Sequence, residues 1–357
     1  MIAKRLIQNS VRQVLVRPGD VSPPSDDFEV IGTFNPGTVS TPDGVVLLVR
    51  VALRPRESRS GFTGLPRWEA NRAITIDWIA DADLEFIDPR VVRCKSEGLT
   101  RLTFTSYLRV VGSTDGLSCD NFNGPVFAPE SPLEEFGVED PRITPLDGRY
   151  FFTYVAVSRH GVCTALASTE DFRTFTRHGI VFGPENKDVV LFPEKIDGQY
   201  VALHRPTGSA GFARPEMWLA RSPDMLHWGE HQHLLGVTPG WCSGRIGAGP
   251  PPLRVAEGWL VVYHGNERPK PSDDVGVYSA GVLLLAAHDP SVILGRATTP
   301  LFSPQIDFEC EGFVPNVVFP TGIIADGDSL LIYYGAGDTH SAVIRISLED
   351  ILASLHK

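Results

Sequence analysis

The chain has 357 residues, of which 42% are hydrophobic, and its formal net charge at pH 7 is -11. This length can bury a sizeable core, and the composition is that of a soluble globular protein. The negative charge argues against a nucleic acid or an anionic membrane as partner, because both favour a basic protein surface.

Cysteine usage and the N-terminal residues bear on the cellular compartment. The five cysteines are odd in number and form no CxxC pair, which argues against a disulfide framework or a structural zinc site. Polar residues interrupt the N-terminus between Gln8 and Gln13, so neither a signal peptide nor an apolar span of ~18 residues is indicated. We therefore expect reduced thiols and a cytoplasmic location.

Residues 1–30 are expected to form an N-terminal extension, and a repeated pattern follows them. It consists of an Asp-Gly or Glu-Gly turn followed by an apolar strand. The turns lie at residues 43–44, 147–148, 197–198, 257–258 and 326–327, with a weaker copy at 97–98. A proline beside a polar residue stands a short distance before each turn, at 35–36, 88–89, 140–141, 193–194, 251–252 and 315–316.

The spacing of these elements indicates the fold class. A period of about 50 to 60 residues with several short strands per unit is typical of a β-propeller blade. A generic all-β sandwich with common turns is the alternative. We predict an all-β structure in which residues 31–345 form one propeller domain. Ser347, followed by LEDIL, fits a helix-capping pattern and predicts a short C-terminal helix within 346–357.

Several strings at these elements resemble glycoside hydrolase family 130. They include GTFNPG (32–37), EEFGVEDPRI (134–143), ENKDVVLFPEKIDGQYVALHRP (185–206), GAGPPP (247–252), DFECEGFVPNVVFPTG (307–322) and YYGAGDT (333–339). The resemblance covers nearly all of residues 31–345 and implies a five-bladed β-propeller that acts on β-mannosides with inversion. Most members are β-mannoside phosphorylases, and a smaller group are β-1,2-mannosidases. Members often self-associate, so a homo-oligomer is also expected.

Six copies of the turn do not match five blades. We interpret the extra copy, around residues 86–110, as a degenerate turn and strand inside a blade. It follows residues 54–83, which we interpret as an insertion relative to shorter members. This insertion and the loop at residues 266–275 are expected to contact the acceptor sugar, since specificity usually resides in loops on a rigid scaffold.

Asp140, in the string GVEDPR, is the candidate proton donor. Cleavage of a β-mannoside needs a proton for the leaving oxygen and a nucleophile at the anomeric carbon. From the residues alone, a structural turn in which Glu139 and Arg142 form salt bridges is the alternative. The resemblance implies catalysis, with the Asp140 proton passing through the O3 hydroxyl of the bound mannose.

The resemblance assigns inorganic phosphate to four residues: Lys187, Arg205, His264 and Tyr278. Two cations, an imidazole and a phenol suit a phosphate dianion, whereas a hydrolase needs a carboxylate to activate water. In the hydrolytic members, acidic residues occupy positions of this set, and none of the four is acidic here. Taken singly, each could be a surface charge or a packed core side chain.

Mannose recognition is assigned to polar residues elsewhere in the family strings. Asn35 and Asp338 match positions of the sugar pocket, and Arg50, Glu139, Arg142 and Asp188 are further candidate substrate contacts. Gly337 departs from the usual YYGAAD string, and a glycine there should make the backbone beside Asp338 slightly more flexible. No metal or nucleotide motif is present, so we expect no cofactor and only inorganic phosphate as co-substrate.

Three functions remain in competition. A phosphorylase would convert a β-mannoside and phosphate into α-mannose 1-phosphate and a shortened acceptor. A β-1,2-mannosidase on the same fold would use water. A sugar-binding propeller without catalysis would lack Asp140 or the basic set, and this sequence has both.

Overall fold

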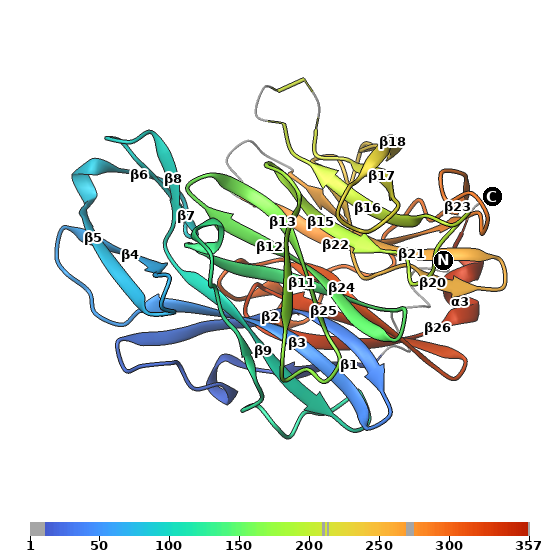
Figure 1. Cartoon of the computed structure of the whole chain (residues 1–357), viewed down its shortest axis with the longest axis horizontal. Helices are drawn as coiled ribbons and strands as arrows, with labels where there is room; N and C mark the ends of the chain where they lie inside the picture. The colour runs from blue at the N-terminus through green and yellow to red at the C-terminus, as the bar shows by residue number, and fades with distance from the viewer. Residues whose placement is uncertain (1–10, 209–210, 213, 269–274, 356–357) are drawn as a thin grey trace.

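The computed structural model describes residues 11–208, 211–212, 214–268 and 275–355. Nearly all regular structure in these residues is antiparallel β-sheet (Figure 1). Short helices cover Pro18–Asp20, Asp81–Asp83 and Pro132–Glu134, together with α2 (Asp307–Cys310) and α3 (Leu348–Ala353). None of the described helices is both long and apolar enough to cross a bilayer.

Five larger sheets follow one another along the described chain. The first contains β2 (Phe28–Thr41), β3 (Gly44–Pro55), β9 (Thr105–Ser113) and β10 (Val126–Phe127). The second contains β11 (Gly137–Leu146), β12 (Arg149–Ser158), β13 (Gly161–Thr169) and β14 (Thr176–Phe182). The third contains β15 (Asn186–Leu191), β16 (Tyr200–Pro206), β17 (Met217–Ser222) and β18 (Gly229–Leu235).

The last two sheets use the C-terminal third of the chain and one N-terminal strand. The fourth contains β19 (Arg245–Ala248), β20 (Leu253–Val255), β21 (Gly258–Glu267), β22 (Val277–Leu285) and β23 (Ile293–Arg296). The fifth contains β24 (Val318–Asp326), β25 (Ser329–Ala336), β26 (His340–Ser347) and β1 (Arg12–Val16). Because β1 pairs with β26, the fifth sheet joins both ends of the chain.

The predicted turns are confirmed as tight connections between paired strands. Asp147 and Gly148 join β11 to β12, with φ angles of 51° and 76°. Such positive φ values at both central residues give the twist that a two-residue hairpin requires, and Asp-Gly adopts them at low cost. The turns at 43–44, 257–258 and 326–327 likewise connect neighbouring strands of one sheet.

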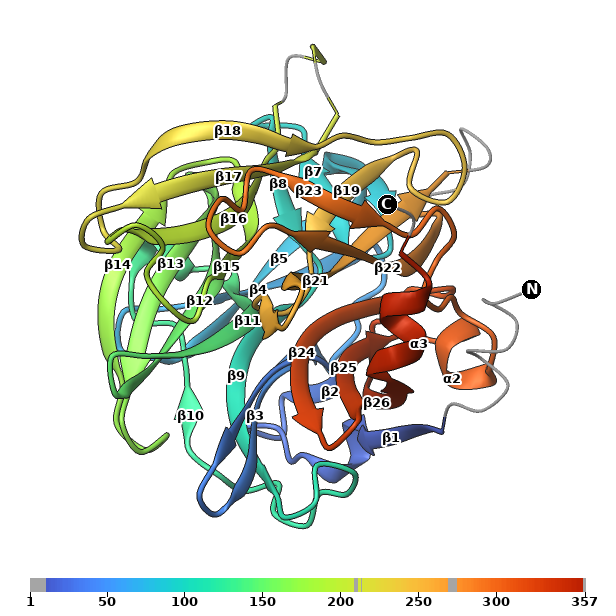
Figure 2. The ribbon, with the colours of Figure 1, turned by 90° about the vertical axis from the view of Figure 1, so that its right-hand side faces the viewer.

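Apolar side chains fill the space between consecutive sheets. One buried cluster joins the first and second sheets, another the second and third, and others the third and fourth and the fourth and fifth. A further cluster brings Leu47 of the first sheet against Tyr333 of the fifth. In Figure 2, β11 and β24 lie near the centre of the view, whereas β14 and β18 lie at its edge.

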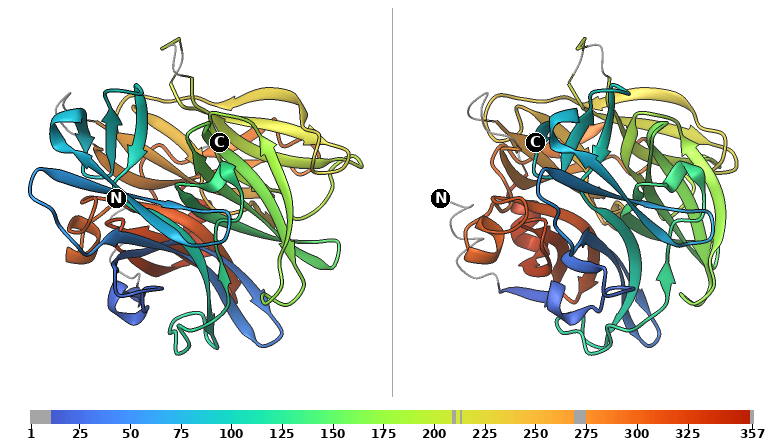
Figure 3. Two further views of the ribbon diagram at one scale, coloured as in Figure 1. Left: turned by 60° about the vertical axis from the view of Figure 1, so that its left-hand side comes forward. Right: turned by 90° about the vertical axis from the view of Figure 1, so that its left-hand side faces the viewer.

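The weaker sixth repeat lies outside these five sheets. Between β3 and β9 the chain forms a hairpin and a small three-stranded sheet, which project to one side of the molecule (Figures 1 and 3). Their strands are β4 (Phe62–Trp68), β5 (Ile74–Ala80), β6 (Leu84–Asp88), β7 (Val91–Cys94) and β8 (Leu99–Leu102). The turn at 97–98 connects β7 to β8, so it begins no further large sheet.

The C-terminal helix and the cysteines agree with the sequence. Ser347 precedes α3, and its side chain accepts a hydrogen bond from the Asp350 amide, as the capping pattern predicts. All five cysteines are free thiols. Residues 1–10 of the expected N-terminal extension and residues 356–357 lie outside the described residues.

Candidate active site

Bulges interrupt the inner strands of three sheets, two of them at proline-containing elements. Asn35, Asp140 and Asp188 have φ angles of 51°, 46° and 56°. Each lies where the pairing register of its strand shifts by a residue. A bulge re-aims a side chain, and Asn and Asp tolerate this left-handed backbone better than other non-glycine residues. Local sequence therefore directs polar side chains out of the regular strand pattern at these points.

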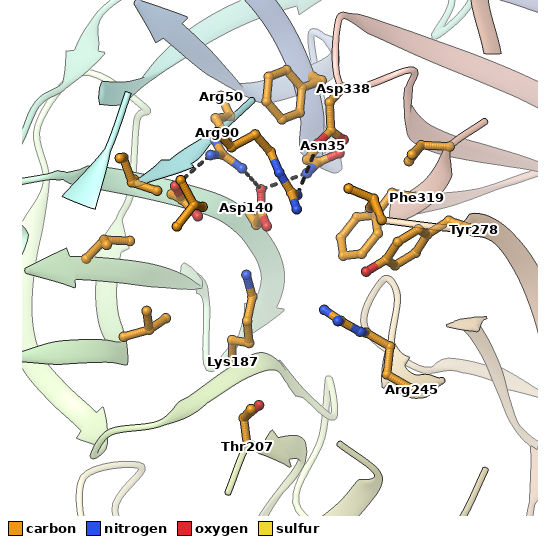
Figure 4. A pocket seen from close by; sticks show the side chains of 18 of the residues that line it. Asn35, Arg50, Arg90, Asp140, Lys187, Thr207, Arg245, Tyr278, Phe319 and Asp338 are labelled. Carbon is orange, nitrogen blue, oxygen red and sulfur yellow. Dashed lines mark hydrogen bonds and ion pairs between the residues drawn. The ribbon is translucent and has the colours of Figure 1, made fainter. Parts of the chain in front are cut away.

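A cavity of about 320 Å³ lies where these strands approach one another (Figure 4). This volume is at the lower end of the range that holds small ligands. Its polar lining comes from all five sheets and from the projecting segment. It includes Asn35, Arg50, Arg90, Glu139, Asp140, Glu185, Lys187, Arg205, Thr207, Arg245, Tyr278 and Asp338.

Asp140 is the buried acid of this cavity, and two side chains hold its carboxylate. Asn35 Nδ2 donates to Asp140 Oδ1 at 2.7 Å, and Arg50 Nη1 donates to the same oxygen at 2.9 Å. Burial by itself raises the pKa of Asp140. The charges of Arg50, Lys187 and Arg142 outweigh burial and hold this pKa below its ordinary value. Asp140 is therefore ionised at neutral pH.

Arg50 is fixed by charge and by aromatic packing. Its Nη2 donates to Glu139 Oε1 at 2.6 Å, in addition to the bond to Asp140. Its guanidinium lies 4.7 Å from the ring centre of Phe34 and 5.5 Å from that of Phe104. These contacts hold a permanent cation against the acid.

Asp338 forms a second acidic position, on the turn between β25 and β26. Burial is the main reason that its pKa is raised to about 6; Asp140 and Glu139 act in the same direction. Arg90 of the projecting segment opposes them, with Nη1 at 3.9 Å from Asp338 Oδ2. Arg90 is itself held by Asp88 at 3.0 Å.

Behind the cavity wall, three basic side chains lie around the carboxylate of Asp188. Arg205 Nη1 lies 2.5 Å from Asp188 Oδ2, and His264 Nε2 lies 3.3 Å from the same oxygen. Arg142 Nη2 is 4.0 Å from Asp188 Oδ1. Although burial raises the pKa of Asp188, Arg205 and His264 outweigh it and keep that pKa well below its usual range. Burial lowers the pKa of His264 to about 4, so this imidazole is neutral at neutral pH.

The structure brings eight of the eleven predicted site residues to the cavity. Lys187, Arg205 and Tyr278 line it together with Asn35, Arg50, Glu139, Asp140 and Asp338. Arg142, Asp188 and His264 are almost completely buried and do not line it. Arg142 donates instead to the carbonyl oxygens of Asp140 and Gly249, at 2.6 and 2.7 Å. These three side chains therefore support the cavity wall from behind.

Two lining arginines were absent from the predicted set. Arg90 stands in Asp88-Pro89-Arg90, which repeats the string Asp140-Pro141-Arg142 and could have drawn attention to it. Arg245 opens β19, two residues before the start of the family-like string GAGPPP. Figure 4 shows the ends of Lys187, Arg245 and Tyr278 facing one another across the space beside Asp140.

The described residues include no cluster of three or more side chains suited to a metal ion. The cavity instead combines several carboxyl groups, among them the held acid Asp140, with a group of cations and with hydroxyl and amide groups. This arrangement can transfer a proton and can hold an anion.

Comparisons with known proteins agree with this chemistry. The model of glycoside hydrolase family 130 described as beta-1,4-mannooligosaccharide phosphorylase matches residues 100–357. A beta-1,2-mannobiose phosphorylase of Listeria innocua is 40% identical over 347 residues, which are 96% of each chain. A 1,2-beta-oligomannan phosphorylase of Thermoanaerobacter is 36% identical over 254 residues, 70% of this chain and 81% of the relative.

The solved structures include a complex of the beta-1,2-mannobiose phosphorylase from Listeria innocua with beta-1,2-mannobiose. It superposes with a TM-score of 0.91 and 39% identity, covering 97% of this chain and 99% of the other. The chain thus belongs to glycoside hydrolase family 130.

Proposed function

We propose that this protein is an inverting β-mannoside phosphorylase, which cleaves a β-mannosidic bond with inorganic phosphate. The products would be α-mannose 1-phosphate and a shortened acceptor. The observation that carries the proposal is the meeting of Lys187, Arg205 and Arg245, from two sheets, beside the buried acid Asp140. The relatives named above as phosphorylases support the same reaction.

The five sheets would be the blades of a single five-bladed propeller, formed by the predicted domain of residues 31–345 and extended by β1 of the predicted N-terminal extension. The apolar clusters between consecutive sheets, and between the first and the fifth, support this arrangement. Pairing of β1 with β26 would complete the last blade. The inner strands of different blades would then meet at one axial cavity, which explains how distant residues share it.

The phosphate would bind between Lys187, Arg245 and Tyr278. Arg50 and Arg90 are already paired with carboxylates. In the described part of the chain, neither Lys187 nor Arg245 has a carboxylate within salt-bridge distance. Two uncommitted cations match the charge of a phosphate dianion, and the Tyr278 hydroxyl can donate to a third oxygen. Arg205 would add charge from the wall, where Asp188 and His264 hold it in place.

Asp140 would supply the proton. A phosphate oxygen attacks the anomeric carbon from the face opposite the leaving oxygen, and the bond to the acceptor breaks as the new bond forms. The acceptor oxygen takes the mannose O3 proton, and O3 takes the proton of Asp140. The neighbouring cations keep Asp140 ionised, but an anion bound nearby raises the pKa of a carboxyl group. Phosphate binding would thus favour the protonated form that the reaction needs.

The hydroxyl groups of the mannose unit would form hydrogen bonds with Asn35, Glu139 and Asp338. The projecting segment would face the acceptor. Arg90, Val91 and Leu102 of that segment line the cavity. Val275 also lines it, whereas residues 269–274 of the expected acceptor loop lie outside the described residues. The acceptor would therefore meet a mixed apolar and basic wall.

Phosphate dependence tests the proposal directly. The protein would be incubated with β-1,2-mannobiose and, separately, β-1,4-mannobiose, with sodium phosphate or with sodium sulfate at equal ionic strength. We expect sugar release and α-mannose 1-phosphate only with phosphate. Equal mannose release in sulfate would indicate hydrolysis and would overturn the phosphorolytic reaction.

A further inference from the structure

A chain of three polar side chains lies on the outer side of the strand pair that carries Lys187 and Arg205. Asn186 Nδ2 is 2.9 Å from His204 Nδ1, and His204 Nε2 is 3.1 Å from His231 Nδ1. Asn186 precedes Lys187 on β15, and His204 precedes Arg205 on β16. Lys187 and Arg205 are directly paired across the two strands.

His204 is buried, with 4% of its surface exposed, and its ring is fixed on both edges and on one face. It stacks on Phe182 with ring centres 4.8 Å apart, and Phe182 stacks in turn on Trp228 at 5.3 Å. Burial, followed by the charge of His231, lowers the pKa of His204 to about 3. The imidazole is therefore neutral at neutral pH.

The hydrogen bonds then require one tautomer. The amide nitrogen of Asn186 can only donate, so His204 Nδ1 accepts and the ring proton sits on Nε2. That proton is donated to His231 Nδ1. The hydrogen bonds therefore run in one direction, from Asn186 on β15, the strand that carries Lys187, to His231 on the exposed strand β18.

We propose that His204 is a positioning residue for phosphate, which fixes the strand pair that presents Lys187 and Arg205; this rests on the proposed phosphorolytic function. Neighbouring side chains of a strand point to opposite faces. The hydrogen bond between Asn186 and His204 therefore leaves the opposite face of the two strands free for the cations. The Asn186–His204 bond spans the two strands one residue from each cation. Thr164 Oγ1 also donates to the Asn186 carbonyl oxygen at 3.1 Å, so this segment is held from the second sheet as well.

The reaction itself does not require His204, since its side chain does not line the cavity. A substitution should therefore act on phosphate binding and leave mannoside binding nearly unchanged. The proposed sugar contacts Asn35 and Asp338 are carried by the first and fifth sheets, whereas His204 lies in the third sheet and stacks on Phe182 of the second.

The experiment compares His204→Phe, His204→Gln and His231→Ala with the wild type. Phe keeps the stacking on Phe182 but removes both hydrogen bonds. Gln restores an acceptor for Asn186 and a donor for His231. His233→Ala is the matched control for His231→Ala. His233 is an exposed histidine on β18, the strand of His231, but it contacts Glu216 and not His204. KM for phosphate and for β-1,2-mannobiose would be measured separately, with circular dichroism to confirm folding.

We expect His204→Phe to raise KM for phosphate about tenfold, with KM for the mannoside changed less than about twofold. His204→Gln should recover most of the loss, His231→Ala should show a smaller increase, and His233→Ala should show none. Equal changes in both KM values, or no change in a folded His204→Phe, would overturn the positioning role. If the wild type shows no phosphate dependence, the proposed function fails first, and the two failures are thus distinguishable.

Discussion

Replacement of Asp140 by Asn isolates the proton-donor role, because it preserves the shape of the side chain and removes its ionisable proton. The amide oxygen can still accept from Asn35 Nδ2 and Arg50 Nη1, which now reach Asp140 Oδ1 at 2.7 and 2.9 Å. The two bonds lose their charged acceptor, at about 1 kcal/mol each. We expect a folded protein whose unfolding free energy is lower by about 2 kcal/mol.

The kinetic loss should depend on the leaving group. A positioned general acid contributes about 10²- to 10⁴-fold to the rate, so we expect a kcat loss of this size with β-1,2-mannobiose. An aryl β-mannoside with a strongly acidic phenol needs little protonation, and its kcat should fall less than about tenfold. Both rates would be measured with saturating phosphate.

Glu139→Gln is the matched control for Asp140→Asn. Glu139 is the neighbouring carboxylate and binds the same guanidinium, with Arg50 Nη2 at 2.6 Å. Substitution of Glu139 should lower kcat by the same factor with β-1,2-mannobiose and with the aryl β-mannoside. If Asp140→Asn also lowers both rates equally, Asp140 acts through binding or structure, and the proton-donor assignment is refuted.

Two further predictions follow from the charges of the site. Lys187→Ala should raise KM for phosphate about tenfold or more and leave KM for the mannoside within about twofold, because it removes a cation that lines the cavity. Steady-state kinetics with each substrate varied in turn would test this prediction, and an equal change in both KM values would contradict it. His264 has its pKa lowered to about 4, so the unfolded chain binds more protons than the native state between about pH 6.5 and pH 4. The unfolding free energy should therefore fall as the pH falls through this window, and His264→Gln should make the fall shallower in urea titrations; an unchanged slope would show that His264 titrates normally.

The parts of the fold that the sequence predicts are those determined by local backbone chemistry. Asp147-Gly148 can enter a two-residue turn without help from distant residues, so the repeat of hairpins was visible in the chain. The sixth copy at 97–98 has the same local chemistry. Only its pairing within a small separate sheet distinguishes it, and that depends on contacts between strands.

The residues of the site fall into the same two groups: those that the local sequence indicates and those that depend on packing between sheets. Asp140 and Asn35 were predictable, since each stands before a proline in the repeated element and within a family string. The burial of His264 and Arg142 was not, because it follows from the packing of one sheet on the next. Arg245 looks like an ordinary surface arginine in the sequence, and the repeated Asp-Pro-Arg string is the signal that marks Arg90. Their place in the cavity is set by the fold of the projecting segment and by the position of β19.

The bulge at Asp140 explains how neighbouring residues can serve one centre. Consecutive side chains of a regular strand point to opposite faces, yet Glu139 and Asp140 both contact Arg50, at 2.6 and 2.9 Å. The register shift between Glu139 and Arg142 and the φ angle of 46° at Asp140 make this geometry available. A regular strand would send one carboxylate into the apolar layer between sheets, where burial would neutralise it. The positive φ at Asp140 is thus part of the proposed catalytic arrangement, since it keeps the acid and its cation on the same side of the strand.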